Sequence, residues 1–299
     1  MIDCSYLPER MYLNIGKVMQ LAIGNIKIST RTAGLHGILN AASAVSSTIF
    51  YPGHVTVERV TLNVPALPSN FDGVRIAHIS DFHVDEWLKH ERLVRAMQQV
   101  SELNADLILI TGDFTSDIDA EIAADITKGL QHLHAREGIF AVLGNHDYRG
   151  DTELVAESIQ AAGVNLLRNA HMTVQRDGQT LYIAGVDDIY MDKHDLDAAL
   201  AGIPTDACAL LMAHEPDYAD EVAADGRVAV QFSGHSHGGQ FRLPLIGVPW
   251  LPPMGRNYVR GAYQIDELQL YVTRGLGVTG IAARINCPAE ITEITLRCE

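Results

Sequence analysis

Short apolar runs alternate with amphipathic stretches through most of this chain, and the alternation predicts its main elements. Five continuous runs have the length of strands that are buried on both faces. They are Val74–Ser80, Leu107–Thr111, Ile139–Leu143, Ala209–Ala213 and Val228–Phe232. Between them, apolar residues recur at helical spacing and predict helices with one buried face. The helical sets are Leu93, Met97 and Val100; Ile122, Ile126, Leu130 and Leu133, with Asp119 as N-cap; and Val155, Ile159 and Ala162, followed by Gly163. Strands that alternate with helices indicate an α/β domain.

The regions around this alternating block add further strands. Val55–Val64 alternates polar and apolar residues in the manner of an edge strand. His171–Arg176 and Gln179–Ala184 flank Asp177-Gly178, which is a two-residue hairpin signal. A short helix is expected near Asp195–Ala201. The last strands are expected at Tyr263–Ile265, Leu268–Thr273 and Glu290–Leu296.

Residues 1–53 differ from the rest of the chain in charge and pattern. Up to residue 52 the segment is net basic, and its charged residues are Arg10, Lys17, Lys27 and Arg31 against Asp3 and Glu9. Its apolar runs are shorter than the ~20 residues that a membrane-spanning helix needs. We therefore predict a helical N-terminal extension over residues 1–53 and one domain over residues 54–299. The extension either lies on anionic lipid, packs on the domain or is partly disordered.

Composition and charge narrow the class of protein. The chain has 299 residues, 47 % of them hydrophobic, which is enough for a full core. Its formal charge of −15 makes a nucleic acid an unfavourable main partner, because an acidic surface repels phosphate backbones. The four cysteines form no CxxC pair and no zinc-finger spacing, which favours a reducing compartment and a cytoplasmic location.

Each of the five apolar runs is followed by a turn with side chains that can bind metal. In chain order these are Asp81 and His83, Asp113, Asn145 with His146, His214, and His235 with His237. Open α/β sheets build their sites at the carboxyl ends of strands, so we expect these side chains to converge. On extended backbone, His235 and His237 would point to the same side. A helix cap or a core histidine would explain one of these residues, but the set favours a metal site.

The number of candidate ligands indicates more than one ion. Aspartate and asparagine oxygens and histidine nitrogens together exceed what one tetrahedral ion takes. Two divalent ions that share a bridging carboxylate fit better, and such pairs stabilise the attacking and leaving oxygens of an in-line displacement. A water molecule between them would supply hydroxide near neutral pH. The chemistry predicted is hydrolysis of a phosphate ester, and Mn, Fe and Zn all suit mixed nitrogen and oxygen ligands.

The blocks DFH, GD, GNHD, the single His214 and GHSHGGQ together resemble the five motifs of the metallophosphoesterase superfamily, the calcineurin-like phosphoesterases. The resemblance covers residues 74–240 and implies a four-layer α/β/β/α sandwich of two mixed sheets flanked by helices. It also implies a role for each residue. Asp81, His83 and His237 would hold one metal, Asn145, His214 and His235 the other, and Asp113 would bridge them. His146 would act as general acid for the leaving oxygen.

Two further comparisons of motifs bear on the substrate. The GD-x-x-DRG block of protein phosphatases is absent, since Ser116 stands where its aspartate would be. Segments after residue 240 resemble a bacterial subgroup that includes envelope-linked phosphodiesterases and UDP-2,3-diacylglucosamine pyrophosphohydrolases of lipid A synthesis. This resemblance implies a phosphodiester or pyrophosphate substrate that is small or lipid-linked. Arg149 and Arg284 are candidate contacts for a second phosphate, or are solvated surface arginines.

The proline-rich segment Leu243–Met254 is predicted to be a loop that starts beside the His235 and His237 turn. Its apolar side chains either pack inward or form an apolar surface next to the site. The second possibility, with the basic extension, would place the protein peripherally at the inner membrane face. A nuclease, a phosphomonoesterase and a non-catalytic interaction module on the same fold are the alternative functions.

Overall fold

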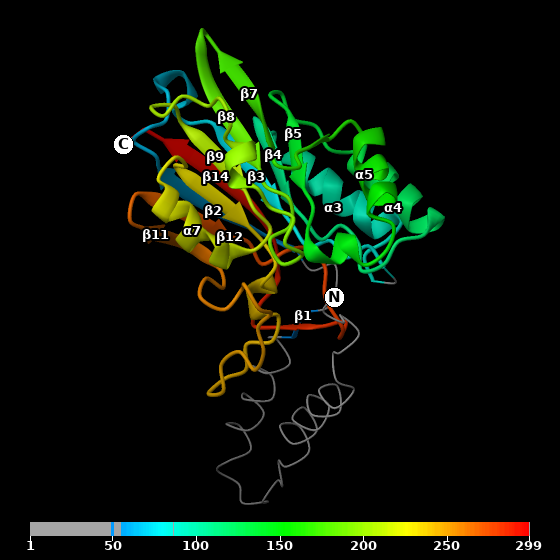
Figure 1. Cartoon of the computed structure of the whole chain (residues 1–299). Helices are drawn as coiled ribbons and strands as arrows, with labels where there is room; N and C mark the ends of the chain where they lie inside the picture. Colours follow the sequence, from blue (N-terminus) through cyan, green and yellow to red (C-terminus); the bar gives the residue numbers. More distant parts are fainter. Residues whose placement is uncertain (1–48, 51–54, 86, 299) are drawn as a thin grey trace, which may run out of the picture. The chain divides into compact units, whose positions relative to one another are not determined.

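Two six-stranded mixed sheets carry most of the strands of the described chain (Figure 1). The computed structural model describes residues 49–50, 55–85 and 87–298. The first sheet has the order β2-β14-β3-β4-β5-β6. Its strands are β2 (Val55–Asn63), β3 (Arg75–Ile79), β4 (Leu107–Thr111), β5 (Ile139–Val142), β6 (Asn165–Leu166) and β14 (Ala289–Arg297). β14 runs antiparallel to β3 and parallel to β2, while β3, β4, β5 and β6 are parallel.

The second sheet has the order β11-β12-β10-β9-β8-β7. Its strands are β7 (Ala170–Arg176), β8 (Gln179–Gly185), β9 (Ala209–Met212), β10 (Val230–Ser233), β11 (Gly261–Ile265) and β12 (Leu268–Val272). β8, β9, β10 and β12 are parallel, and antiparallel partners stand at both edges. The β7–β8 hairpin turns at Asp177 and Gly178, both with positive φ, as the sequence predicts.

Helices cover the outer face of each sheet and complete the four predicted layers. The first sheet is covered by α3 (Glu91–Glu102), α4 (Ala120–Leu130) and α5 (Thr152–Ala161), which lie together on one side of Figure 1. The second sheet is covered by α6 (Leu196–Ala199) and α7 (Ala219–Asp225). Short 3-10 turns, η1 (Ser69–Phe71), η2 (Asn145–Tyr148), η3 (Pro216–Tyr218) and η4 (His237–Gly239), connect these elements. The α/β/β/α architecture is therefore confirmed.

Three apolar clusters separate the layers. One lies between α3, α4 and α5 and the first sheet, with Met97, Ile126 and Ile159 against strand residues such as Ile108. A second fills the space between the two sheets, and a third lies under α6 and α7. The cap expected for α4 is present, because the Asp119 side chain accepts a hydrogen bond from the backbone N–H of Ile122.

The predicted extension over residues 1–53 lies outside the described residues, apart from β1 (Ile49–Phe50). β1 pairs antiparallel with β13 (Arg284–Ile285), a short strand that the sequence pattern does not reveal. The boundary at residue 54 stays a prediction. No helix of the described residues is long and apolar enough to cross a membrane.

Candidate metal centre

Five strand ends meet at one point of the sandwich, and they carry the predicted ligands. β3, β4 and β5 of the first sheet lead into the turns at Asp81, Asp113 and Asn145. β9 and β10 of the second sheet lead into the turns at His214 and His235. Because β3, β4 and β5 are parallel to one another, as are β9 and β10, each sheet brings these carboxyl ends to the same edge.

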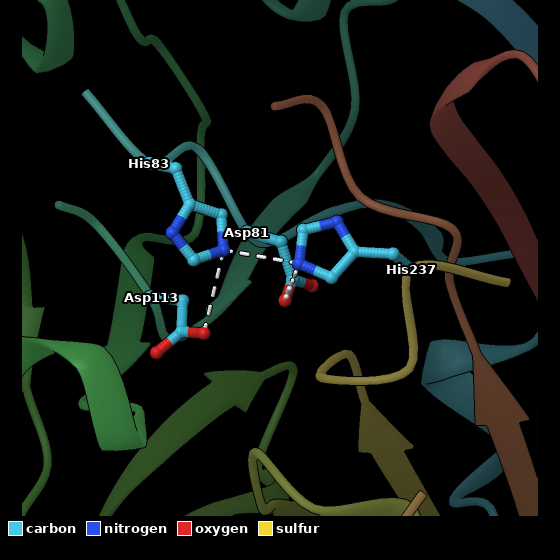
Figure 2. A group of neighbouring side chains, drawn as sticks. All are labelled: Asp81, His83, Asp113 and His237. Carbon is cyan, nitrogen blue, oxygen red and sulfur yellow. Dashed lines mark hydrogen bonds and ion pairs between the residues drawn. The ribbon is translucent and has the colours of Figure 1, made fainter. Parts of the chain in front are cut away.

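Two groups of buried ligand atoms result. In each group all ligand atoms lie within 4.8 Å of one another. The first group contains Asp81, His83, Asp113 and His237 (Figure 2). The second contains Asp113, His214 and His235, so Asp113 is the member that the groups share.

The distances within the first group are short for side chains without a cation between them. His83 Nε2 lies 3.0 Å from His237 Nε2 and 3.5 Å from Asp113 Oδ2, and His237 Nε2 lies 3.3 Å from Asp81 Oδ1. Figure 2 shows both rings and both carboxylates turned toward one small space. Carboxylate oxygens and imidazole nitrogens in this arrangement are a suitable ligand set for a divalent metal.

The second group includes atoms that lack a hydrogen-bond partner among the described residues. His214 Nε2 lies 3.2 Å from Asp113 Oδ2 and has no hydrogen bond. The Oδ1 atom of Asn145 is also buried without a partner, which is costly unless an ion or water satisfies it. A metal held by Asp113, His214, His235 and Asn145 would satisfy these atoms, so the residues present fit the ion that the sequence predicts.

The ligand turns have an unusual backbone. Asp81, His83, Asp113, His235 and His237 all have φ between 46° and 66°, in the left-handed region. Such a conformation costs a non-glycine residue about 1–3 kcal/mol and clusters at functional sites. The sequence-based assumption that His235 and His237 lie on extended backbone is wrong. β10 ends at Ser233, and the turn that follows sends the two imidazoles into different ligand groups.

Close packing of the β4 and β5 turns explains their glycines. A Cβ atom on Gly144 would lie 2.5 Å from Asp113 Oδ1, and one on Gly112 would lie 2.6 Å from the Gly144 nitrogen. Since real Cβ atoms do not approach so closely, both positions require glycine for Asp113 to reach the centre.

Backbone carbonyls fix two of the imidazoles. His214 Nδ1 lies 2.6 Å from the Thr111 carbonyl oxygen, and His235 Nε2 lies 2.8 Å from that of Pro253. Donation to these carbonyls leaves the other ring nitrogen of each histidine free as a ligand. His83 is held more loosely, with its Nδ1 3.3 Å from Ser116 Oγ.

Comparison with known proteins identifies the family. The family model for calcineurin-like phosphoesterases matches residues 74–239, which include every turn described above. The chain belongs to the calcineurin-like phosphoesterases. It is thus a metal-dependent phosphoester hydrolase.

Several relatives align with most of this chain. The uncharacterized metallophosphoesterase YkuE of Bacillus subtilis (strain 168) is 33% identical over 82% of this chain and 87% of its own length. Phosphodiesterase YaeI of Escherichia coli (strain K12) is 30% identical over 74% of this chain and 82% of its own. A transmembrane protein with a metallophosphoesterase domain from Danio rerio is 31% identical, but the match covers only 61% of that protein. An archaeal phosphodiesterase structure aligns over 74% of this chain and 99% of its own, with a TM-score of 0.40 and 17% identity.

Burial and neighbouring charges shift the pKa values of the side chains in the phosphoesterase centre. Burial raises the pKa of Asp81 to about 7. Burial would also raise the pKa of Asp113, but the imidazoles of His214 and His146 hold it well below its usual range. Burial lowers the pKa of His83 and His237 well below the usual value. Neutral imidazoles at His83 and His237 beside an ionised Asp113 are the protonation states that metal binding requires. Burial lowers the pKa of His214, but the Asp113 carboxylate raises it well above its usual value, so a metal ion there would displace a proton.

His146 adjoins the centre without belonging to either ligand group. Its backbone N–H donates to Asp113 Oδ1 at 2.8 Å, and its ring meets that of His83 edge-on, with centroids 4.6 Å apart. Its Nδ1 atom is buried and has no hydrogen-bond partner among the described residues. Burial lowers the pKa of His146 to about 4, although the Asp113 carboxylate opposes this shift. The substrate-free imidazole is therefore neutral near pH 7.

Asp147 has a structural role that the sequence left undecided. Its carboxylate is fully buried and accepts hydrogen bonds from the backbone N–H groups of Phe114, Thr115 and Gly144. It therefore ties the β4 turn to the β5 turn and does not contact the His146 ring in any hydrogen bond of the structure. No sequence pattern marks this role, because the partners are backbone groups.

The two arginines predicted to contact substrate differ in placement. Arg149 is exposed beside His146, where it lowers the pKa of that imidazole. Arg284 is 2% exposed, and its guanidinium donates to the carbonyls of His237, Arg274, Gly275 and Gly277. These bonds fix the backbone around His237. The predicted phosphate contact for Arg284 does not fit this placement, because its donors are used inside the protein.

Proposed function

We propose that the chain hydrolyses a phosphodiester or pyrophosphate bond with a dinuclear metal centre. The observation that carries this proposal is the position of Asp113, whose carboxylate belongs to both ligand groups. One short anion between two sets of histidines is what a bridged pair of cations needs. Asp81, His83 and His237 would complete the first set, and Asn145, His214 and His235 the second.

When bound, two divalent ions would acidify a water molecule and neutralise charge on the phosphate oxygens. The side chains of the protein would orient the bridging carboxylate and supply the proton. Asp113 is held by the His146 backbone N–H, so its carboxylate stays aimed between the two ligand groups. The His146 imidazole has an unpartnered nitrogen from which it would donate a proton to the leaving oxygen. Because its pKa is lowered to about 4, we propose that it takes up this proton beside an anionic substrate.

We propose a substrate that carries a second phosphate or a lipid. Arg149 is exposed next to His146, so its guanidinium can reach a phosphate outside the metal ligands. The loop that contacts His235 through Pro253 carries exposed apolar side chains, which suits a lipid-linked ester of the UDP-diacylglucosamine kind. A purified protein with added Mn²⁺ should be screened on monoesters, diesters and nucleotide-sugar pyrophosphates with and without acyl chains. Cleavage of monoesters alone would contradict the proposal.

The dinuclear centre has its own test. Asp113→Ala should lose both ions, since both groups share its carboxylate, and activity should fall to background. Metal analysis should find about two ions per wild-type chain. Asp119→Ala is the matched control, because Asp119 lies on the same loop but only caps α4, at a cost of about 1 kcal/mol. Full metal content in Asp113→Ala, or one ion per wild-type chain, would refute the bridge.

A further inference from the structure

The loop over residues 243–254 exposes a cluster of large apolar side chains beside the metal centre. Leu245 is 108% exposed, Ile246 64% and Trp250 42%. The apolar tip, Leu245, Ile246 and Trp250, thus contains three of the seven large hydrophobic residues that are exposed in the described chain. Burial inside the protein, one of the two possibilities raised by the sequence, does not hold for these three side chains.

The tip is built on a fixed base. The backbone N–H groups of Leu243 and Gly247 donate to each other's carbonyls at 2.8 and 2.9 Å, which closes a tight turn. Val248 packs against Gly239, and the Pro253 carbonyl contacts His235. The exposed residues are therefore held outward by an ordered loop, and an ordered apolar surface next to a site indicates a binding partner.

The charge around the tip is opposite to that of the whole chain. The sequence has 37 acidic residues against 22 lysines and arginines, yet residues 228–265 contain no Asp or Glu and three arginines. Arg256 and Arg260 are exposed, and neither forms an ion pair with a described carboxylate. Two carboxylates accept hydrogen bonds from this segment: Asp217 from the backbone N–H groups of residues 256–258, and Asp220 from the Tyr258 hydroxyl.

The net-basic N-terminal segment joins the domain at the same place. β1 pairs with β13, and Ile285 of β13 also forms a bridge with Phe241 at the base of the loop. Figure 1 shows β1 beside the gold loop. In the sequence, the 48 residues before β1 carry Arg10, Lys17, Lys27 and Arg31 against two acids.

We propose that this loop docks on a bilayer of anionic lipid, with the tip in the interfacial layer and Arg256 and Arg260 against the headgroup phosphates. The apolar side chains suit the interfacial layer of a bilayer, and the arginines without ion pairs suit its headgroup phosphates. A protein partner would not require an excess of cations. The proposal deepens the lipid-linked form of the proposed function, since Pro253 connects the docking loop to the ligand His235. Docking in this way would place the metal centre near the membrane surface, close to the phosphate ester of a lipid-linked substrate.

Trp250 reports on the docking directly. The chain has two tryptophans, so Trp87→Phe in the full chain leaves Trp250 as the sole fluorophore. With vesicles of phosphatidylcholine and phosphatidylglycerol, its emission should shift to the blue and acrylamide quenching should fall. Quenching that is unchanged by vesicles would overturn the proposal. So would a Trp250 already shielded before vesicles are added, which would mean that the N-terminal segment covers it.

Substitutions separate the loop from other sources of binding. Leu245→Ser with Ile246→Ser should weaken vesicle binding about tenfold or more, because two aliphatic side chains no longer leave water. Arg256→Gln with Arg260→Gln should weaken binding at low salt and reduce its salt dependence. Met172→Ser is the matched control, since Met172 is 43% exposed on the edge strand β7, and it should bind as the parent does.

Parent-like binding by the Leu245→Ser, Ile246→Ser variant would overturn the proposal, because the N-terminal segment alone would then hold the lipid. Equal loss in Met172→Ser would do the same. Neither readout involves hydrolysis. A chain that binds vesicles without cleaving lipid-linked esters would refute only the substrate class, and one that cleaves them without binding would refute only the docking surface.

Discussion

At the scale of single residues, the centre is made of residues whose backbone has a positive φ, a conformation that most residues avoid. Asp81, Asp113 and His235 all have positive φ values. Asp, Asn and His tolerate this region better than β-branched residues do. The ligand types therefore suit the backbone as well as the metal, and a substitution at these positions changes both.

His146 offers the sharpest test at this scale. His146→Ala removes the unpartnered imidazole but keeps the backbone N–H that holds Asp113, so metal content should change little. The rate should fall by about 10²–10⁴ for substrates with poor leaving groups, because no acid protonates the leaving oxygen. For nitrophenyl esters the loss should be smaller. Equal losses for both leaving groups, measured as kcat at saturating substrate, would contradict proton donation.

Residue identity alone could predict which side chains converge but not what orients them. The carboxylates and imidazoles follow predicted strands, so the sequence shows that they converge. The groups that fix His214 and His235 are the carbonyls of Thr111 and Pro253, which every residue possesses. No sequence pattern marks such a contact, and the left-handed turn at His237 was missed for the same reason.

At the scale of elements, long and periodic segments were predictable and short ones were not. β4 has the predicted bounds, and α3, α4 and α5 bury the predicted faces. α7 has seven residues and β13 has two, and segments this short do not show a hydrophobic period that identifies a helix or a strand. β13 is formed by pairing with β1 and with the segment at Phe241, both far away in the sequence, and it carries Arg284, whose structural role was missed with it.

Arg284→Lys tests that structural role. A lysine ammonium lacks the planar fork that reaches several carbonyls at once, so buried acceptors around His237 would lose partners. We expect a loss of about 2–3 kcal/mol in the free energy of unfolding, and a lower metal content. Arg297→Lys is the control, since its ion pair with Asp72 is exposed and contributes little. Normal stability with a raised KM for pyrophosphates would instead restore the substrate contact predicted from the sequence.

At the scale of the whole molecule, packing of one sheet on the other creates an environment that neither sheet has alone. His78 on β3 is fully buried between the sheets, edge-on to Phe232 and Tyr271 of the second sheet. Its Nε2 lies 2.9 Å from Thr111 Oγ1, and burial lowers its pKa to about 3. The strand was predictable from sequence, but the histidine in its middle was not predictable as a core residue.

This burial makes the sandwich sensitive to acid. Between pH 6.5 and about 3 the unfolded chain protonates His78 and the folded chain does not, so stability falls as pH falls. His78→Gln should be the less stable protein at pH 7.5, yet its deficit should shrink by about 2 kcal/mol at pH 5. Urea unfolding of both proteins at the two pH values measures this. A deficit independent of pH would show that His78 has the same pKa in the folded protein as in the unfolded chain.

The place of β14 in the first sheet sets an order of events during synthesis. All nine residues of this last strand pair with β2, the first long strand, and four of them pair with β3 on the other side. β2 has no other partner in the sheet, so it cannot join until residues 289–297 of β14 leave the ribosome. Closing the long loop between β2 and β14 is slow. Until it closes, an unpaired strand edge can pair with another chain and cause aggregation. Nearly every other element can be synthesised and packed before β14 is available to pair with β2.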